Sequence, residues 1–276
     1  MDRFNNNAVQ PHEKIAISSA KHILITIICL GSFLTVLQAD LPLWALSPIT
    51  PGWNLIFDEE FNGKSLDTSK WNIENMASGG YHNCCLGYGV QYFTPQALSF
   101  LNGSLRITTK KHHMRGYAYT SGAITTENKF SFLYGRVDIR AKLPKTRGFW
   151  PALWLLAGGR SGYAPFEIDM MELLGNDPTT IYISNHWGHR QTERHYTGPD
   201  FSQNYHIFSI VWNHQRITWY IDGVQRSQTS RGVSNKSMYI IINSSLGGSW
   251  PGYPDATTVL PQHMDIDYVR VYQPKS

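Results

Sequence analysis

The sequence predicts an all-β fold for residues 53–276, a two-sheet antiparallel β-sandwich of the jelly-roll kind. The first observation is that short runs of β-branched and aromatic residues recur from Trp53 onward, separated by Gly, Asn, Asp or Pro. The second is that helical periodicity is absent after residue 40. The third is composition: 42% of the 276 residues are hydrophobic and 13% are aromatic, enough for one domain with a substantial core.

A leader precedes this domain. Residues 23–37 form an apolar run, with Arg3, Lys14 and Lys21 before it and Ala39 as a small residue at a cleavage point. This pattern predicts a signal peptide over residues 1–39 and a secreted or extracytoplasmic protein. The alternative is an uncleaved membrane anchor through residues 23–39, because spanning takes about 20 mainly apolar residues. The Pro-containing residues 40–52 are expected to be a linker.

Within the domain, the clearest strand candidates are five runs in which β-branched and aromatic residues cluster or alternate with polar ones. These are residues 104–109 (SLRITT), 134–143 (YGRVDIRAKL), 217–223 (ITWYIDG), 238–245 (MYIIINSS) and 266–273 (IDYVRVYQ). Asn62–Gly63, Asn102–Gly103 and Asp222–Gly223 are expected to be tight turns.

Composition also excludes several classes of function. The formal net charge of +4 is small and the 24 basic residues are scattered, so a nucleic-acid partner is not expected. Cys84 and Cys85 are adjacent and cannot join distant segments, so a strained vicinal bridge and two free thiols are the open alternatives. A metal pair is the least expected state, because further cysteines are lacking. The histidines of HWGH and KHHMRG lack a tetrahedral ligand set, so zinc is not expected either. We expect a monomer.

The stretch FEIDMMEL, Phe166 to Leu173, places three carboxylates in otherwise apolar chain. On a regular strand Glu167 and Asp169 share a face, whereas Glu172, an odd number of residues from both, points to the other face. A β-bulge at Met170 or Met171 would return Glu172 to the shared face. The sequence therefore predicts a bulged strand that gathers all three acids.

Such a group has a chemical use. Hydrolysis of a glycosidic bond with retention takes two carboxyl groups, one as nucleophile and one as acid and then base. Asp169 between them would hold Glu167 and Glu172 at unequal pKa values. The alternative is an ordinary amphipathic strand whose acids face solvent.

Several segments besides the acids resemble one family. EIDMMEL is similar to the active-site strand of glycoside hydrolase family sixteen, in its laminarinase-like branch, where the pattern is ExDxxE with a bulge. FDEEFNGKSLDTSKWNIE, VQYFTPQAL, NGSLRITTKK and the block from YTSGAITT to FWPALWLL resemble the family's segments in the same order, as do SNHWG and MDIDYVRVYQ. The resemblance implies a jelly roll with a concave substrate cleft, a polysaccharide substrate and no catalytic cofactor.

The resemblance also implies residue roles. Glu167 matches the nucleophile, Asp169 the assisting acid and Glu172 the acid/base. The other matched positions border the family's cleft and are expected to contact substrate, with Trp150 as the more exposed of the two tryptophans on one strand; they are Gln91, Tyr92, Arg136, Trp150, Trp154, His186, Trp187, Asn243 and Trp250. Members of the family often hold one structural calcium, and Glu60, the carbonyl near Gly103 and Asp267 match its ligands.

The chain also departs from the family pattern. Tyr163 and Phe166 replace a tryptophan and a glycine of the laminarinase-like branch, and YGVQYFT lacks a polar pair before Gln91. Reaction type is therefore better specified than substrate. The leading hypothesis is a secreted retaining endo-glycosidase that acts on β-1,3-glucan. A transglycosylase with the same covalent step and a non-catalytic glucan-binding protein are the alternatives.

Overall fold

The computed structural model describes residues 52–77, 89–158 and 166–275, which all lie within one compact unit, Ile49–Ser276. The predicted leader, the linker up to residue 51, Cys84, Cys85 and Tyr163 lie outside the described residues. In the described part of the chain, no helix has the length and hydropathy of a membrane-spanning segment.

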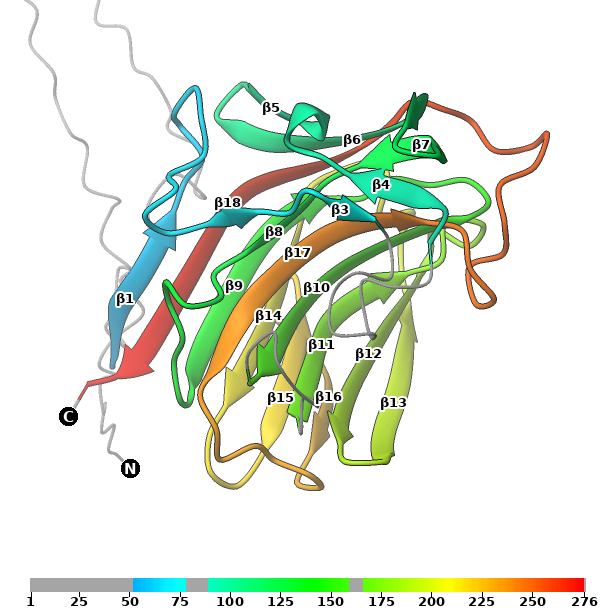
Figure 1. Cartoon of the computed structure of the whole chain (residues 1–276). Helices are drawn as coiled ribbons and strands as arrows, with labels where there is room; N and C mark the ends of the chain where they lie inside the picture. Colours follow the sequence, from blue (N-terminus) through cyan, green and yellow to red (C-terminus); the bar gives the residue numbers. More distant parts are fainter. Residues whose placement is uncertain (1–51, 78–88, 159–165, 276) are drawn as a thin grey trace, which may run out of the picture. The chain divides into compact units, whose positions relative to one another are not determined.

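The described residues form two sheets, of 11 and 7 strands (Figure 1). The larger sheet contains β1 (Trp53–Glu59), β3 (Met76–Ala77), β4 (Gln91–Phe93), β5 (Leu98–Leu101), β6 (Ser104–Met114), β7 (Tyr117–Ser121), β9 (Gly135–Lys142), β14 (His206–Trp212), β15 (Ile217–Ile221), β16 (Val224–Thr229) and β18 (Gln262–Pro274). Its order is β16-β15-β14-β9-β18-β6-β7-β4-β3, with β1 beside β18 and β5 beside β6. A short 3-10 turn, Pro95–Ala97, separates β4 from β5.

The smaller sheet contains β2 (Asn72–Ile73), β8 (Ala123–Thr125), β10 (Phe149–Ala157), β11 (Phe166–Leu173), β12 (Thr180–Trp187), β13 (Arg190–Thr197) and β17 (Met238–Leu246). Its order is β13-β12-β11-β10-β17-β8-β2, and its pairs are antiparallel. The two-sheet sandwich predicted from the sequence is confirmed, with one addition: β4 and β7 pair in parallel.

All five strand candidates coincide with strands, namely β6, β9, β15, β17 and β18. Two of them are too long: Tyr134 and Leu143 flank β9, and Asp222 and Gly223 follow β15. Two of the three turn predictions are also confirmed. Asn102–Gly103 joins β5 to β6 and Asp222–Gly223 joins β15 to β16 as two-residue loops, and each of these four residues has a positive φ. The prediction for Asn62–Gly63 is wrong, because the pair lies in the connection between β1 and β2 and joins no hairpin. The positive φ there belongs to Phe61.

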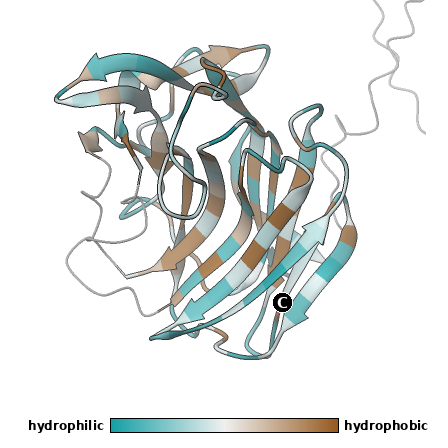
Figure 2. Cartoon of the chain, turned by 90° about the vertical axis from the view of Figure 1, so that its right-hand side faces the viewer, coloured by the Kyte–Doolittle hydropathy of each residue, from teal (hydrophilic) through white to brown (hydrophobic). Residues whose placement is uncertain are grey.

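The main core lies between the two sheets and takes side chains from both. Val137, Ile139 and Ala141 alternate inward from β9, while Leu153 and Leu155 come from β10, and all five are at most 1% exposed. Figure 2 shows the matching alternation of hydrophobic and hydrophilic residues along several strands. Because each strand of the smaller sheet turns every second residue toward this core, the residues between them face away from it.

A second apolar cluster lies on that other face of the smaller sheet. Ala152, Trp154 and Leu156 of β10 pack there with Phe93 of β4. They alternate with the core residues Leu153 and Leu155 along the same strand. Phe93 of β4 and Met76 of β3 therefore cover part of the outer face of the smaller sheet.

Candidate active site

Strand β11 carries the predicted bulge. Its pairing with β10 runs from Leu153↔Met171 directly to Trp154↔Asp169, which leaves Met170 without an opposite residue. Met170 and Met171 both lie in the main core, at 1% and 0% exposure. Two consecutive inward side chains shift the alternation by one residue. Glu167, Asp169 and Glu172 consequently all lie on the outer face of the smaller sheet, which we call the acid-bearing face.

Strand β10 lies alongside the acids and supports Glu172. Ala152 of β10 stands opposite Glu172, and Trp150 shares the face two residues away. The indole Nε1 of Trp150 donates a hydrogen bond to Oε1 of Glu172 at 2.8 Å. This bond fixes the direction of the Glu172 carboxyl group and couples it to an aromatic ring on the same face.

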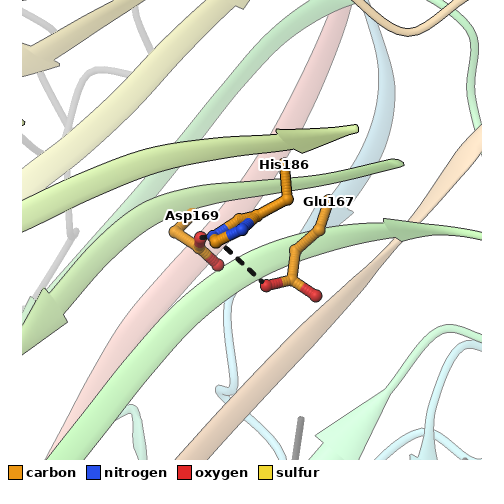
Figure 3. A group of neighbouring side chains, drawn as sticks. All are labelled: Glu167, Asp169 and His186. Atoms are coloured by element: carbon orange, nitrogen blue, oxygen red, sulfur yellow. Dashed lines mark ion pairs between the residues drawn. The ribbon is translucent and has the colours of Figure 1, made fainter. Parts of the chain in front are cut away.

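Strand β12 supports Asp169 from the other side. Ser184 stands opposite Asp169, and its Oγ donates to Oδ2 of Asp169 at 2.5 Å. The Nε2 of His186 lies 3.0 Å from the same oxygen and 3.7 Å from Oε1 of Glu167. Figure 3 shows the imidazole beside Asp169, with Glu167 facing the pair. From the other sheet, Nε1 of Trp219 donates to the backbone carbonyl of Asp169 at 2.8 Å.

The two glutamates are held where ionisation is unfavourable. Burial raises the pKa of Glu167 well above its usual value, and the charges of Asp169 and Glu172 raise it further. Burial also raises the pKa of Glu172, followed by the charge of Asp169, while the hydrogen bond from Trp150 opposes the rise. The charge of Asp169 therefore acts on both glutamates, and burial together with that charge favours the protonated form of each carboxyl group.

His186 is poised to be protonated. Burial lowers the pKa of its imidazole, but the hydrogen bond to Asp169 and the charge of that carboxylate outweigh burial, and the pKa is raised overall. A protonated His186 donates to Asp169 and places a positive charge between two carboxylates.

Three aromatic side chains gather next to Glu172. The ring of Trp250 meets those of Trp150 and Tyr182 edge to face, with centroids 5.4 and 5.0 Å apart. Trp250 is 38% exposed, so ring surface is available beside the acids. Faces of aromatic rings suit the apolar faces of sugars. Of the predicted contact residues, the structure thus brings Trp150, Trp250 and His186 together with the acids.

Four other predicted contact residues are buried. Trp154 is 3% exposed within the second apolar cluster, and its indole donates to Oδ1 of Asn243 at 2.8 Å. Asn243, 4% exposed, donates in turn to Oγ of Ser245 at 3.0 Å. Gln91 is fully buried and accepts from the backbone of Leu246, while Tyr92 is 7% exposed. These side chains stabilise the sheet around the site and offer substrate little accessible surface.

Two predicted contacts lie on other faces of the molecule. Arg136 of β9 alternates with the core residue Val137, so it points out of the larger sheet, where it pairs with Asp138 at 2.8 Å. Trp187 alternates with His186 along β12 and lines a cavity with Arg231 and Gly232. Strand alternation therefore turns Arg136 and Trp187, both expected to contact substrate, away from the acid-bearing face.

The residues matched to a calcium site do not fit one here. Both carboxylate oxygens of Glu60 are bonded to the guanidinium of Arg270, at 2.6 and 2.8 Å. Asp267 pairs with Arg140 at 2.5 Å. Gly103 lies in the β5–β6 turn, close to the side-chain oxygen of Asn62. Two arginines thus occupy the carboxylates that calcium would need.

A separate group of potential metal-ligating atoms lies within the acid site itself. Ligand atoms of Glu167, Asp169 and His186 lie within 4.8 Å of one another. This set of three is one short of the four ligands of a structural zinc site.

Sequence reasoning missed three residues of the site, namely Tyr182, Ser184 and Trp219. Tyr182 and Ser184 share a strand face with His186 in the run YISNH, so strand alternation would have placed them beside it. Trp219 is on the other sheet, and no sequence signal indicates its hydrogen bond to Asp169.

Comparisons with known proteins agree with this geometry. Residues 90–270 match the sequence profile of the glycosyl hydrolases family 16. The glucan endo-1,3-beta-glucosidase A1 of Niallia circulans is 36% identical over 82% of this chain, which spans 39% of that relative's length. A beta-glucanase of Rhodothermus marinus is 30% identical, with 81% of this chain and 86% of the relative covered.

A solved structure is similar throughout the fold. The laminarinase catalytic domain of Thermotoga maritima superimposes with a TM-score of 0.75 at 37% identity, over 81% of this chain and 99% of that one. The family profile covers more than half of the chain, and it includes the bulged strand with all three acids. The chain therefore belongs to glycosyl hydrolase family 16.

Proposed function

We propose that this chain is a retaining endo-glycosidase that hydrolyses β-glucan, with β-1,3-glucan as its preferred substrate. The single observation that carries the proposal is the bulge at Met170, which puts three acids on one face of the sheet. On that face Trp150 donates a hydrogen bond to Glu172, and His186 contacts Asp169. Two relatives named above as a glucan endo-1,3-beta-glucosidase and a laminarinase support the choice of linkage.

In this mechanism, ionised Glu167 attacks the anomeric carbon while protonated Glu172 donates its proton to the leaving oxygen. A covalent glycosyl-enzyme forms. Glu172, now a carboxylate, removes a proton from water, and the water opens the intermediate with net retention. The charge of Asp169 raises the pKa of Glu167, and the imidazole of His186 lies between these two carboxylates, 3.7 Å from Oε1 of Glu167 and 3.0 Å from Oδ2 of Asp169.

The arrangement supports the proton assignment at Glu172. Its carboxyl group accepts from Trp150, and burial with the Asp169 charge raises its pKa, so the acid form is available for the first step. Two-carboxylate chemistry needs no cofactor.

The proposal is tested with laminarin, mixed-linkage glucan, agarose and carrageenan as substrates, with release of reducing ends as the readout. We expect release from laminarin, loss of that release in Glu167→Gln, and a β-configured product in time-resolved NMR. A product of inverted configuration would overturn the mechanism. Release of reducing ends from agarose or carrageenan but not from laminarin would overturn the assignment of β-glucan as the substrate. Chromatography of longer products separates transfer to a second sugar from hydrolysis.

We also propose that residues 1–39 direct export of the chain. The support is the apolar run of residues 23–37 with basic residues before it. Expression in a secreting host, followed by the intact mass of the product, distinguishes cleavage near Ala39 from retention as an anchor. A full-length product that stays in the soluble cell fraction would contradict export.

A further inference from the structure

Edge strand β13 adds side chains to the acid-bearing face. Its register places Gln191 opposite His186, Glu193 opposite Ser184 and His195 opposite Tyr182. Directly opposed residues in an antiparallel pair project from the same face of the sheet. The ring contact of His195 with Tyr182, at 6.1 Å between centroids, agrees with that placement. Glu193 is therefore a fourth carboxylate on this face, one strand beyond Ser184 and Asp169.

Glu193 is exposed, and its charge reaches the centre of the site. Burial and Asp169 are the main causes of the raised pKa of Glu172, and the negative charge of Glu193 adds to them. For the pKa of His186, burial is the largest influence and lowers it, whereas Asp169 raises it. The negative charge of Glu193 adds to the rise caused by Asp169. A sugar that borders Glu172 and His186 on the β12–β13 side would feel that charge directly.

No basic side chain offsets Glu193 on the described strands β10 to β13 of this face. Arg190 and Arg194 alternate to the opposite face of β13, where Arg194 lines a cavity of about 300 Å³ with Ile183 and Trp219. Among the described residues, no side-chain hydrogen bond or ion pair engages the Glu193 carboxylate, whereas Asp58, Asp255 and Glu60 each have a basic partner. On the described strands β10 to β13 of this face, the imidazole side chains are those of His186 and His195, and His186 contacts Asp169.

We propose that Glu193 is a charge-selecting residue, which favours neutral sugars and disfavours sugars that carry a carboxylate or sulfate group at the position next to Glu172 and His186. The inference rests on the proposed glycosidase function of the same face. A neutral glucan offers hydroxyl groups that the Glu193 carboxylate can accept from, whereas an anionic substituent would meet a like charge and find no counter-ion. Because Glu193 is exposed, we expect a repulsion equivalent to about a five- to tenfold change in relative kcat/KM at low salt.

The experiment uses the full chain and two polymers with the same backbone, laminarin and carboxymethyl-laminarin. The readout is the ratio of kcat/KM for the charged polymer to kcat/KM for the neutral one, at about 0.02 M and about 0.5 M NaCl. Taking a ratio cancels any effect of the substitution on the titration of Glu172, since the same enzyme acts on both polymers. The variants are Glu193→Gln and Glu193→Lys. The matched control is Asp58→Asn, which removes one negative charge from an exposed side chain of β1 on the larger sheet.

We expect the ratio to rise about fivefold or more at low salt in Glu193→Gln and further in Glu193→Lys, and to stay at the wild-type value in Asp58→Asn. The gain should shrink at high salt, because screening removes a Coulombic effect. A ratio that is the same in all four proteins would overturn the inference while leaving the glycosidase proposal intact. An equal rise in Asp58→Asn would also overturn it, since the effect would then come from net charge.

A binding measurement keeps the two proposals separable. In a Glu167→Gln background, calorimetric titration with each polymer reports charge selection without turnover. One outcome would support charge selection and contradict the hydrolase. In it, the Glu167→Gln protein binds laminarin in preference to carboxymethyl-laminarin, the added Glu193→Gln substitution weakens that preference, and the wild-type chain cleaves neither polymer. Absence of binding and of cleavage with both polymers would overturn both proposals.

Discussion

At the scale of single residues, the site depends on hydrogen bonds that decide which carboxyl group keeps a proton. Trp150 donates to Glu172, whereas His186 and Ser184 contact Asp169, which lies on the same face of β11. Each contact stabilises one protonation state relative to the other. Activity of the proposed acid therefore depends on pH in a way that single substitutions should move.

Trp150→Phe should shift the basic limb of the pH profile of kcat/KM to higher pH. The hydrogen bond from Trp150 lowers the pKa of Glu172, so its removal leaves that pKa higher and the acid form persists further. A hydrogen bond worth about 1 kcal/mol corresponds to a shift of somewhat less than one pH unit. The control is Trp250→Phe, which removes an aromatic neighbour of Trp150 but no bond to Glu172. An unshifted basic limb in Trp150→Phe would contradict the assignment of Glu172 as the acid.

The raised pKa values of both glutamates also make a prediction about stability. A carboxyl group whose pKa is raised by folding binds its proton more tightly in the folded state. Its contribution therefore favours folding at low pH and is lost as pH rises from the unfolded toward the folded pKa. Glu167→Gln and Glu172→Gln each replace an ionisable carboxyl group with a neutral amide, so the stability that the wild type loses as pH rises is retained. Each substitution should therefore raise the Tm at pH 7 by a few degrees. About 1 kcal/mol corresponds to roughly 2–4 °C in a domain of this size.

Thermal unfolding of the two variants at pH 7 and near pH 4 checks this, with Asp58→Asn as the control. The gain should fade near pH 4, where wild-type Glu167 and Glu172 are largely protonated in both states. A Tm at pH 7 equal to or below that of the wild type would mean that the folded protein already compensates the two charges.

At the scale of elements, the bulge in β11 depends on both sheets. Its inward methionines fill the core, and Trp219 of β15 donates to the carbonyl of Asp169 directly beside the bulge. A bulge interrupts the strand ladder, so a carbonyl at its edge benefits from a partner outside the sheet. Trp219 is a positioning residue in this sense, because its indole bonds to the backbone carbonyl of Asp169 rather than to the carboxyl group.

Trp219→Phe should cost about 1–3 kcal/mol of stability, because a buried carbonyl loses its donor. We also expect kcat to fall at temperatures well below the new Tm, while the Tm of Trp212→Phe falls without a matching loss of kcat. Trp212 is an equally buried tryptophan whose indole donates to the carbonyl of Ser234, away from the acids. Stopped-assay kinetics at one temperature separate the two effects. Equal kcat losses in both variants would assign Trp219 a purely structural role.

The same element shows how far sequence reasoning reached. Alternation and the spacing of Glu167, Asp169 and Glu172 predicted a bulge at Met170 or Met171, and the register confirms it at Met170. Period-two patterns are strong because one face of each strand is buried. The contacts of Arg136 and Trp187 were misplaced because resemblance transfers a position along the chain, whereas alternation decides the face. Contacts between sheets, such as Trp219 with Asp169, carry no local pattern.

At the scale of the whole molecule, β1 closes the larger sheet beside the last strand of the chain. The two strands pair from Trp53↔Pro274 to Glu59↔Val269, and the ion pair of Glu60 with Arg270 extends that contact. Phe57 and Phe61 add buried rings to the main core, at 7% and 1% exposure. The folded unit therefore needs the chain from Trp53 onward, since its two ends are neighbours in one sheet.

Two truncations test where the folding unit begins. A chain that starts at Trp53 should unfold in one cooperative transition and keep its activity on glucan, because it retains β1 and every residue of the main core. A chain that starts at Gly63 loses β1, Phe57, Phe61 and the Glu60–Arg270 pair, and leaves an edge of β18 unpaired. Loss of two buried phenylalanines alone costs about 6 kcal/mol or more, comparable with the whole stability of many domains. Circular dichroism melts should show a cooperative transition for the first chain and none for the second, and the reverse result, or a Trp53 chain that does not fold, would move the boundary of the domain.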